Sequence, residues 1–256
     1  MLDEPYRWVE AIRNRREYLE DQLKGASPVV AVTYCEGLLL LTSTPGPRKL
    51  FEVYNQVAFA SIGHPADIEK LRKAIIDIAH VEAFNLSPSD VSLQRLVAFG
   101  LGPIMKAAFD EIFRSPFIAR VLVAELDPSP PTETFYTIDA DGSFASAGDA
   151  AVIAGTRASA EAMLVRLREE GAPGAALEQA LTRALEAWAV GRGHAARQEQ
   201  GGDEGAAAAV DLAATVRAAL ERGRFDAAVL DRTRPTKTKF RLLDRAELEP
   251  VLARYR

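Results

Sequence analysis

The sequence is short of several residue types and patterns, and each shortage excludes a class of protein. It contains a single cysteine, so an internal disulfide is excluded, and we expect Cys35 to be a small buried or half-buried side chain at a strand end. The spacing of its three histidines does not match that of metal ligands, so we expect no metal site and no cofactor. No apolar run approaches the roughly 20 residues of a membrane span, so we expect no membrane partner.

Concentrated positive charge is also missing. The net charge is −5, with acidic and basic residues mixed along the chain, which argues against a nucleic-acid-binding protein. The one basic stretch, Arg232 to Arg241, favours a solvated edge strand whose cations prevent pairing between sheets. The N-terminal residues MLDEPYRW contain no secretory hydrophobic region, so we expect a cytoplasmic protein.

Short apolar runs begin at Ser27. The stretch Ser27 to Gly63 reads SPVVAVTYCEGLLLLTSTPGPRKLFEVYNQVAFASIG, with strand-length runs separated by turn residues. The pair Glu36-Gly37 predicts a hairpin between the first two strands, and a third run extends from Val53 to Ile62. Because the runs are almost continuously apolar, we expect the sheet to be covered on both faces.

A helix is predicted before these strands, over Arg7 to Lys24. Trp8, Ile12, Leu19 and Leu23 fall at helical spacing, and Gly25 is a natural C-terminal stop. The apolar stripe is narrow and the rest of the helix is charged. A neighbouring subunit is therefore a plausible second surface for this helix.

The remaining chain alternates between pairs of helices and groups of strands. The pattern predicts helices from Pro65 to Phe84, from Ser87 to Arg114 with an interruption near Gly100, from Ala158 to Glu169, from Ala175 to Val190 and from Ala206 to Arg222; it predicts strands over Phe117–Leu126, Thr134–Ile138 and Asp226–Leu230, with Ser143–Ala154 pairing back on the second of them. Residues 191–205 read as a mobile loop inside an insertion of about 191–222. This order predicts an α+β fold, a four-layer αββα sandwich of two antiparallel sheets flanked by helices, as a single domain of residues 1–256.

Three strings carry a resemblance to a known family. They are EYLEDQLKGASPVVAVTYCEG, RKLFEVYNQVAFASIGH and FDAAVLDRTRP. The chain resembles bacterial 20S proteasome α-type subunits, in which a helix with a Glu-Tyr pair precedes a small residue, the opening strand, a Gly turn, a Lys and a closing Gly. The matching residues here are Glu17-Tyr18, Ala26-Ser27, Gly37, Lys49 and Gly63. The match covers roughly the first 170 residues and resumes near the C-terminus.

The resemblance implies a non-catalytic member of the N-terminal-nucleophile hydrolases. Catalytic members expose the opening Thr, Ser or Cys by self-cleavage, use its amine as the base, and support it with a Lys and an Asp. Here the opening residue is Ser27, which is internal, and the Asp position is Ser43, so only Lys49 remains. We therefore predict no catalytic residue. The alternative is a self-processed peptidase or amidohydrolase that cleaves after Ala26 and acts through Ser27.

The same resemblance implies the partners and the binding residues. The subunit would form a homoheptameric ring, stack on proteasome β subunits, and receive tagged unfolded proteins from a AAA ATPase. Lys49 would pair with the C-terminal carboxylate of this activator, and Glu17 would be a second element of that pocket. The N-terminal residues would form the gate of the pore: Met1, Leu2, Asp3, Glu4, Pro5 and Tyr6.

Overall fold

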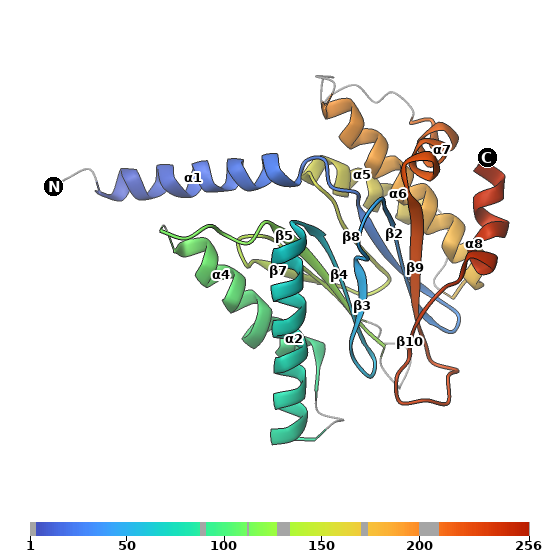
Figure 1. Cartoon of the computed structure of the whole chain (residues 1–256), viewed down its shortest axis with the longest axis horizontal. Coiled ribbons are helices and arrows are strands. Elements are labelled where there is room, and N and C mark those ends of the chain that lie inside the picture. The colour runs from blue at the N-terminus through green and yellow to red at the C-terminus, as the bar shows by residue number, and fades with distance from the viewer. Residues whose placement is uncertain are drawn as a thin grey trace.

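Two antiparallel sheets lie face to face in the computed structural model, which describes residues 4–87, 91–111, 113–126, 134–169, 174–199 and 210–255 (Figure 1). The first sheet has the order β10-β9-β2-β1-β8 and contains β1 (Val29–Tyr34), β2 (Gly37–Thr44), β8 (Ala150–Ile153), β9 (Arg224–Asp231) and β10 (Phe240–Leu242). The second has the order β3-β4-β5-β6-β7 and contains β3 (Leu50–Tyr54), β4 (Val57–Gly63), β5 (Ala119–Glu125), β6 (Thr134–Ile138) and β7 (Phe144–Ala147).

Helices cover the outer face of each sheet. The described helices are α1 (Glu4–Leu23), α2 (Pro65–Asn85), α3 (Leu93–Arg95), η1 (Leu96–Leu101), α4 (Gly102–Asp110), α5 (Arg157–Glu169), α6 (Leu177–Glu199), α7 (Leu212–Arg222), α8 (Arg245–Leu252) and η2 (Ala253–Tyr255). Residues of α5 to α8 pack on the first sheet, and residues of α2, η1 and α4 pack on the second. The predicted four-layer sandwich is confirmed.

The almost continuous apolar runs reflect this layering. In β2, Leu39 and Leu41 pack with the helices, whereas Leu38 and Leu40 pack between the two sheets. Side chains of a strand alternate between its two faces, so a strand buried on both faces must be apolar at every position. The predicted Glu36-Gly37 hairpin is confirmed, because β1 and β2 pair antiparallel around it.

Two strand predictions were wrong in detail. The run from Val53 to Ile62 is two strands, β3 and β4, joined at Asn55, whose φ of 29° lies in the left-handed region that Asn tolerates. The stretch 143–154 is also two strands: β7 pairs with β6, but β8 crosses over and pairs with β1 in the other sheet. Hydrophobic alternation alone does not distinguish one long strand from two short ones.

Two helices are longer than predicted. Helix α1 begins at Glu4 and not at Arg7. Helix α6 continues to Glu199, so the loop predicted from Gly191 is wrong for residues 191–199, while residues 200–209 lie outside the described part of the chain. A Cβ on Gly191 would lie 2.2 Å from the Met163 sulfur, and one on Gly193 would lie 2.4 Å from a Val210 methyl. These glycines allow close packing and do not mark a loop.

Helix α1 projects from the sandwich and is held at its C-terminal half (Figure 1). Leu19 and Leu23 are buried, whereas 43% of Trp8 and 66% of Val9 are exposed. Arg15 donates to the backbone carbonyls of Ala108, at 3.2 Å, and of Glu111, at 2.8 Å, near the C-terminal end of α4. These contacts fix the second half of the helix, and the first half extends into solvent.

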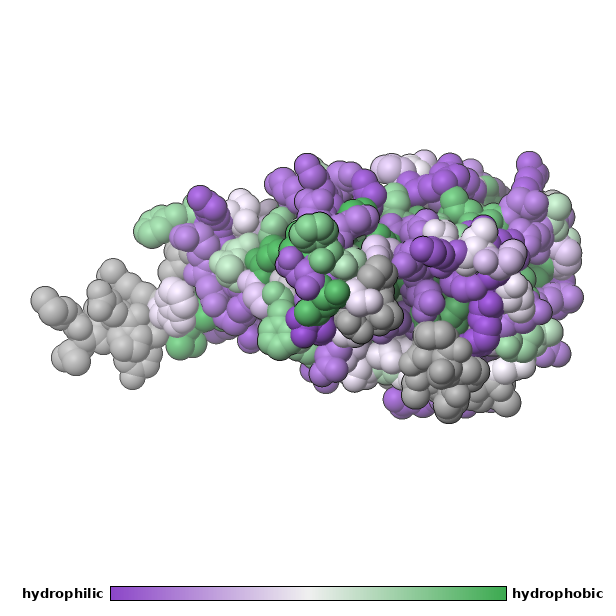
Figure 2. Space-filling model, turned by 90° about the horizontal axis from the view of Figure 1, so that it is seen from below, coloured by the Kyte–Doolittle hydropathy of each residue, from purple (hydrophilic) through white to green (hydrophobic). Residues whose placement is uncertain are grey.

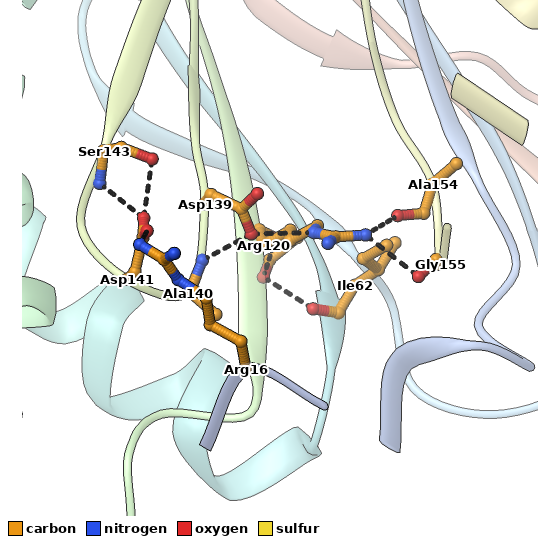
Figure 3. Close-up of polar contacts among 10 residues, drawn as sticks. Arg16, Ile62, Arg120, Asp139, Ala140, Asp141, Ser143, Ala154 and Gly155 are labelled. Atoms are coloured by element: carbon orange, nitrogen blue, oxygen red, sulfur yellow. Dashed lines mark hydrogen bonds and ion pairs between the residues drawn. The ribbon is translucent and has the colours of Figure 1, made fainter. Parts of the chain in front are cut away.

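A polar network fixes the same end of α1 to the turns of the sheets (Figure 3). The Arg16 guanidinium lies 3.3 Å from Asp141 in the β6–β7 turn. Arg120 of β5 pairs with Asp139 at 2.9 Å and donates to the carbonyls of Ala154 and Gly155, at 2.7 and 2.9 Å, beyond β8. Arg120 therefore joins the two sheets beside the end of α1.

Three further predictions concern membrane spans, metal sites and the burial of Cys35. Among the described residues, no helix is long and apolar enough to cross a membrane. No group of His, Cys, Asp or Glu in the described ranges could hold a metal ion. Cys35 was predicted to be at least half-buried and is exposed, because it lies at the tip of the β1–β2 hairpin, where the strands leave the core.

Candidate functional site

A cavity of about 1080 Å³ lies where the end of β2, the start of β3 and the junction between α1 and β1 meet. Its walls come from the segments 25–27, 43–49 and 63–69 and from α6 and α7. Figure 1 shows the C-terminal end of α6 and all of α7 at this upper end of the molecule. The volume is at the top of the range for small-molecule sites, so the cavity can hold several residues of a peptide.

Lys49 precedes β3 and lines this cavity half-buried. Its Nζ donates to the carbonyl oxygen of Ser27 at 3.4 Å, and no carboxylate of the described residues forms an ion pair with it. The pKa of Lys49 is lowered to about 8, chiefly by burial; Asp226 opposes the shift and Arg192 adds to it. A desolvated ammonium without a carboxylate partner is a site that an incoming carboxylate can occupy.

Ser27 lines the same cavity, but its chemistry is that of an internal residue. Its nitrogen is in the peptide bond with Ala26, whose own N–H donates to the carbonyl of Leu23 at 2.8 Å. The Ser27 hydroxyl accepts from the Trp188 indole nitrogen at 3.2 Å. Ser43, at the predicted position of the supporting Asp, is buried in β2 and lines the cavity as well. The fold thus brings Ser27, Ser43 and Lys49 together without a free α-amine on Ser27 and without a carboxylate at the position of Ser43.

The other predicted site residues lie elsewhere. Glu17 is exposed on α1, pairs with Arg13 at 3.4 Å, and does not line the Lys49 cavity within one chain. Of the predicted gate residues, Met1, Leu2 and Asp3 lie outside the described residues, and the backbone of residues 4–6 forms the first turn of α1.

The cavity contains cations that the sequence analysis did not identify. They are Arg48, Arg192, Arg197 and Arg222. Arg48 is adjacent to Lys49, but the other three come from a region that reads as a loop followed by an Ala-rich helix. Only the packing of α6 and α7 against the end of β2 brings them to Lys49.

Comparison with known proteins gives relatives along almost the whole chain. No family model matches the sequence. The chain is 29% identical over 247 residues to a proteasome subunit alpha of Geodermatophilus obscurus, covering 96% of this chain and 79% of the relative. It is 29% identical to that of Actinosynnema mirum, covering 95% and 84%, and 28% identical to that of Kineococcus radiotolerans, covering 95% and 94%. Along almost its whole length, the chain is therefore similar to bacterial proteasome α-type subunits.

Proposed function

We propose that this chain is a non-catalytic subunit of the outer ring of a proteasome core particle, with residues 1–256 as one α-type domain. The observation that carries the proposal is the state of Ser27, which remains in a peptide bond behind α1 while its hydroxyl accepts from Trp188. A hydroxyl nucleophile needs a base within hydrogen-bonding reach, and in this superfamily the base is the free amine of the same residue. The relatives carry the name proteasome subunit alpha.

Ring assembly is supported by apolar side chains that a lone chain would leave in water. On α1 they are Trp8 and Val9, at the projecting end of the helix. At the lower end of α2 they are Val81 and Phe84, 57% and 90% exposed, and Figure 2 shows apolar surface gathered on this lower face. Exposed apolar patches of this kind mark protein–protein contacts. We infer that seven copies form a ring and that the ring stacks on β subunits in the cytoplasm.

The Lys49 cavity is the proposed dock for an activator. The C-terminal carboxylate of an ATPase subunit would accept from the Lys49 ammonium, in a charge-assisted hydrogen bond shielded from solvent. Docking would shift α1, which ends four residues before Ser27, and with it the gate residues 1–6. Tagged unfolded substrates would then pass through the pore. Glu17 would reach such a pocket only from the neighbouring copy, since it does not line the cavity of its own chain.

Particle imaging tests the ring. The full-length chain, coexpressed with a β-type subunit from the same genome, should give seven-fold rings stacked on β rings. Intact mass of the purified chain should show that it still begins ahead of Ser27. A monomer under these conditions, with a mature N-terminus at Ser27, would instead support a self-processed hydrolase.

Docking at Lys49 should depend on pH with a defined sign. Because the pKa of Lys49 is about 8, the ammonium is fully formed below about pH 7, and the affinity for a carboxylate-terminated peptide should be constant there. A bound carboxylate raises the pKa of Lys49, so binding above pH 8 takes up a proton and affinity falls as pH rises, by at most about tenfold per unit.

Fluorescence anisotropy with a dye-labelled peptide, measured between pH 6 and pH 10, checks this dependence. The matched control is Lys49→Arg, because arginine stays charged over this whole range. Its affinity should not fall between pH 8 and pH 10. An equal fall in the wild type and in Lys49→Arg would show that another group titrates.

A further inference from the structure

The wall of the cavity that faces Lys49 is built by α6 and α7, and it is cationic. Among the described residues, five cationic side chains line the cavity, Arg48, Lys49, Arg192, Arg197 and Arg222, against two carboxylates, Glu69 and Asp211. Three of the five come from the end of α6 and from α7. This segment therefore supplies most of the cationic side chains that line the cavity.

Both lining carboxylates are already engaged. Glu69 Oε2 accepts from Arg72 Nε at 2.8 Å. Asp211 is the N-cap of α7, where its side chain accepts from the backbone N–H of Ala214 at 2.9 Å. Neither carboxylate forms an ion pair with Arg48, Lys49 or Arg222, so these three cations favour an anionic ligand.

The cations differ in their exposure. Lys49 is half-buried, whereas Arg48 and Arg222 are exposed at the mouth. No carboxylate in the described part of the chain pairs with Arg48 or with Arg222. The guanidinium fork of arginine suits a carboxylate, which it can bind through two hydrogen bonds. The mouth can therefore hold a second negative group in addition to the one at Lys49.

The lining of the cavity is also partly apolar. Phe51, Ile68, Val210 and Trp188 line it together with the cations. A peptide tail with a free C-terminus, an apolar residue and an acidic residue upstream would match this combination of charges and apolar surface. A single small anion would leave the apolar wall and one of the two cationic positions without a partner.

We propose that Arg48 and Arg222 form a second carboxylate subsite, so that the cavity selects a peptide tail carrying an acidic side chain upstream of its C-terminal carboxylate. This inference rests on the proposed docking function and adds a specificity to it. Helix α7, which carries Arg222, then has a definite role, which is to complete the subsite.

The test measures the binding of synthetic peptides to the full-length chain in its assembled form. The probe is dye-labelled Gly-Ser-Glu-Leu-Glu-Leu with a free C-terminus, compared with the same peptide carrying Gln or Lys in place of both Glu residues. Because Arg48 and Arg222 are exposed, the Gln peptide should bind only about 1.5-fold to fivefold more weakly than the Glu peptide. In Arg222→Glu, the preference between the Glu and Lys peptides should reverse.

Arg217→Glu is the matched control, since Arg217 is exposed on α7 but does not line the cavity. It should keep the wild-type preference, and Arg48→Glu should behave as Arg222→Glu does. Equal binding of the Glu and Gln peptides would overturn the second subsite. If the Glu and Gln peptides bind equally and amidation of the C-terminus abolishes the binding of both, only the second subsite fails and docking at Lys49 stands. If amidation has no effect on binding, the docking function itself fails.

Discussion

Replacing Lys49 with alanine should abolish activator-stimulated protein degradation while leaving the assembled rings intact. The side chain is half-buried in the cavity and donates only to the Ser27 carbonyl, at the long distance of 3.4 Å, so its loss should cost the fold little. For a docking carboxylate the loss is larger, because a hydrogen bond between charged groups contributes about 1.5–3 kcal/mol. That corresponds to a decrease in tail affinity of roughly tenfold to a hundredfold for each subunit.

The measurement compares degradation of an unfolded substrate with and without the ATPase, alongside anisotropy with the carboxylate-terminated peptide. Lys73→Ala is the matched control, since Lys73 is exposed on α2 and does not line the cavity. The control should behave as the wild type in both assays. Unchanged stimulation by the ATPase in Lys49→Ala would refute the assignment of this cavity as the activator dock.

A chain that begins at Ser27 should unfold or aggregate instead of gaining hydrolase activity. Such a chain lacks Leu23, which is fully buried in the core between the two sheets, and Leu19, which packs with Phe109 and Ala140. Deleting one buried leucine side chain already costs about 2–5 kcal/mol, out of a typical total of about 5–15 kcal/mol. The Ser27 residue that would be exposed also has no Asp beside it, because that position is Ser43.

Thermal unfolding by circular dichroism and hydrolysis of fluorogenic peptides test this expectation. The melting temperature should fall by at least about 10 °C, if a folded state remains at all. A deletion of residues 1–10 is the control, because it keeps Leu19, Leu23, Arg15 and Arg16 and should change stability much less. A stable truncated chain that cleaves the reporter without a β subunit would establish the self-processed hydrolase.

The layered fold was predictable because a strand that is buried on both faces is apolar at successive positions. Every position of β2 from Leu38 to Leu41 is apolar, and this pattern arises only in a strand covered on both sides. Errors occurred where the decision depended on contacts between distant segments. The stretch 143–154 divides between two sheets because β8 pairs with β1, more than a hundred residues away along the chain.

The same division between local information and contacts of distant segments applies to the candidate site. The order of residues determined that Ser27 is internal, that its Asp is missing and that Lys49 precedes a strand, because covalent connectivity and residue type are local properties. Tertiary structure alone decided that Arg192 and Arg222 line the cavity of Lys49, and that Gly191 lies inside a helix and not in a loop. The physical reason is that a cavity, and the close helix packing that only glycine permits, are made by segments remote in sequence, whose contacts leave no periodic pattern in either segment.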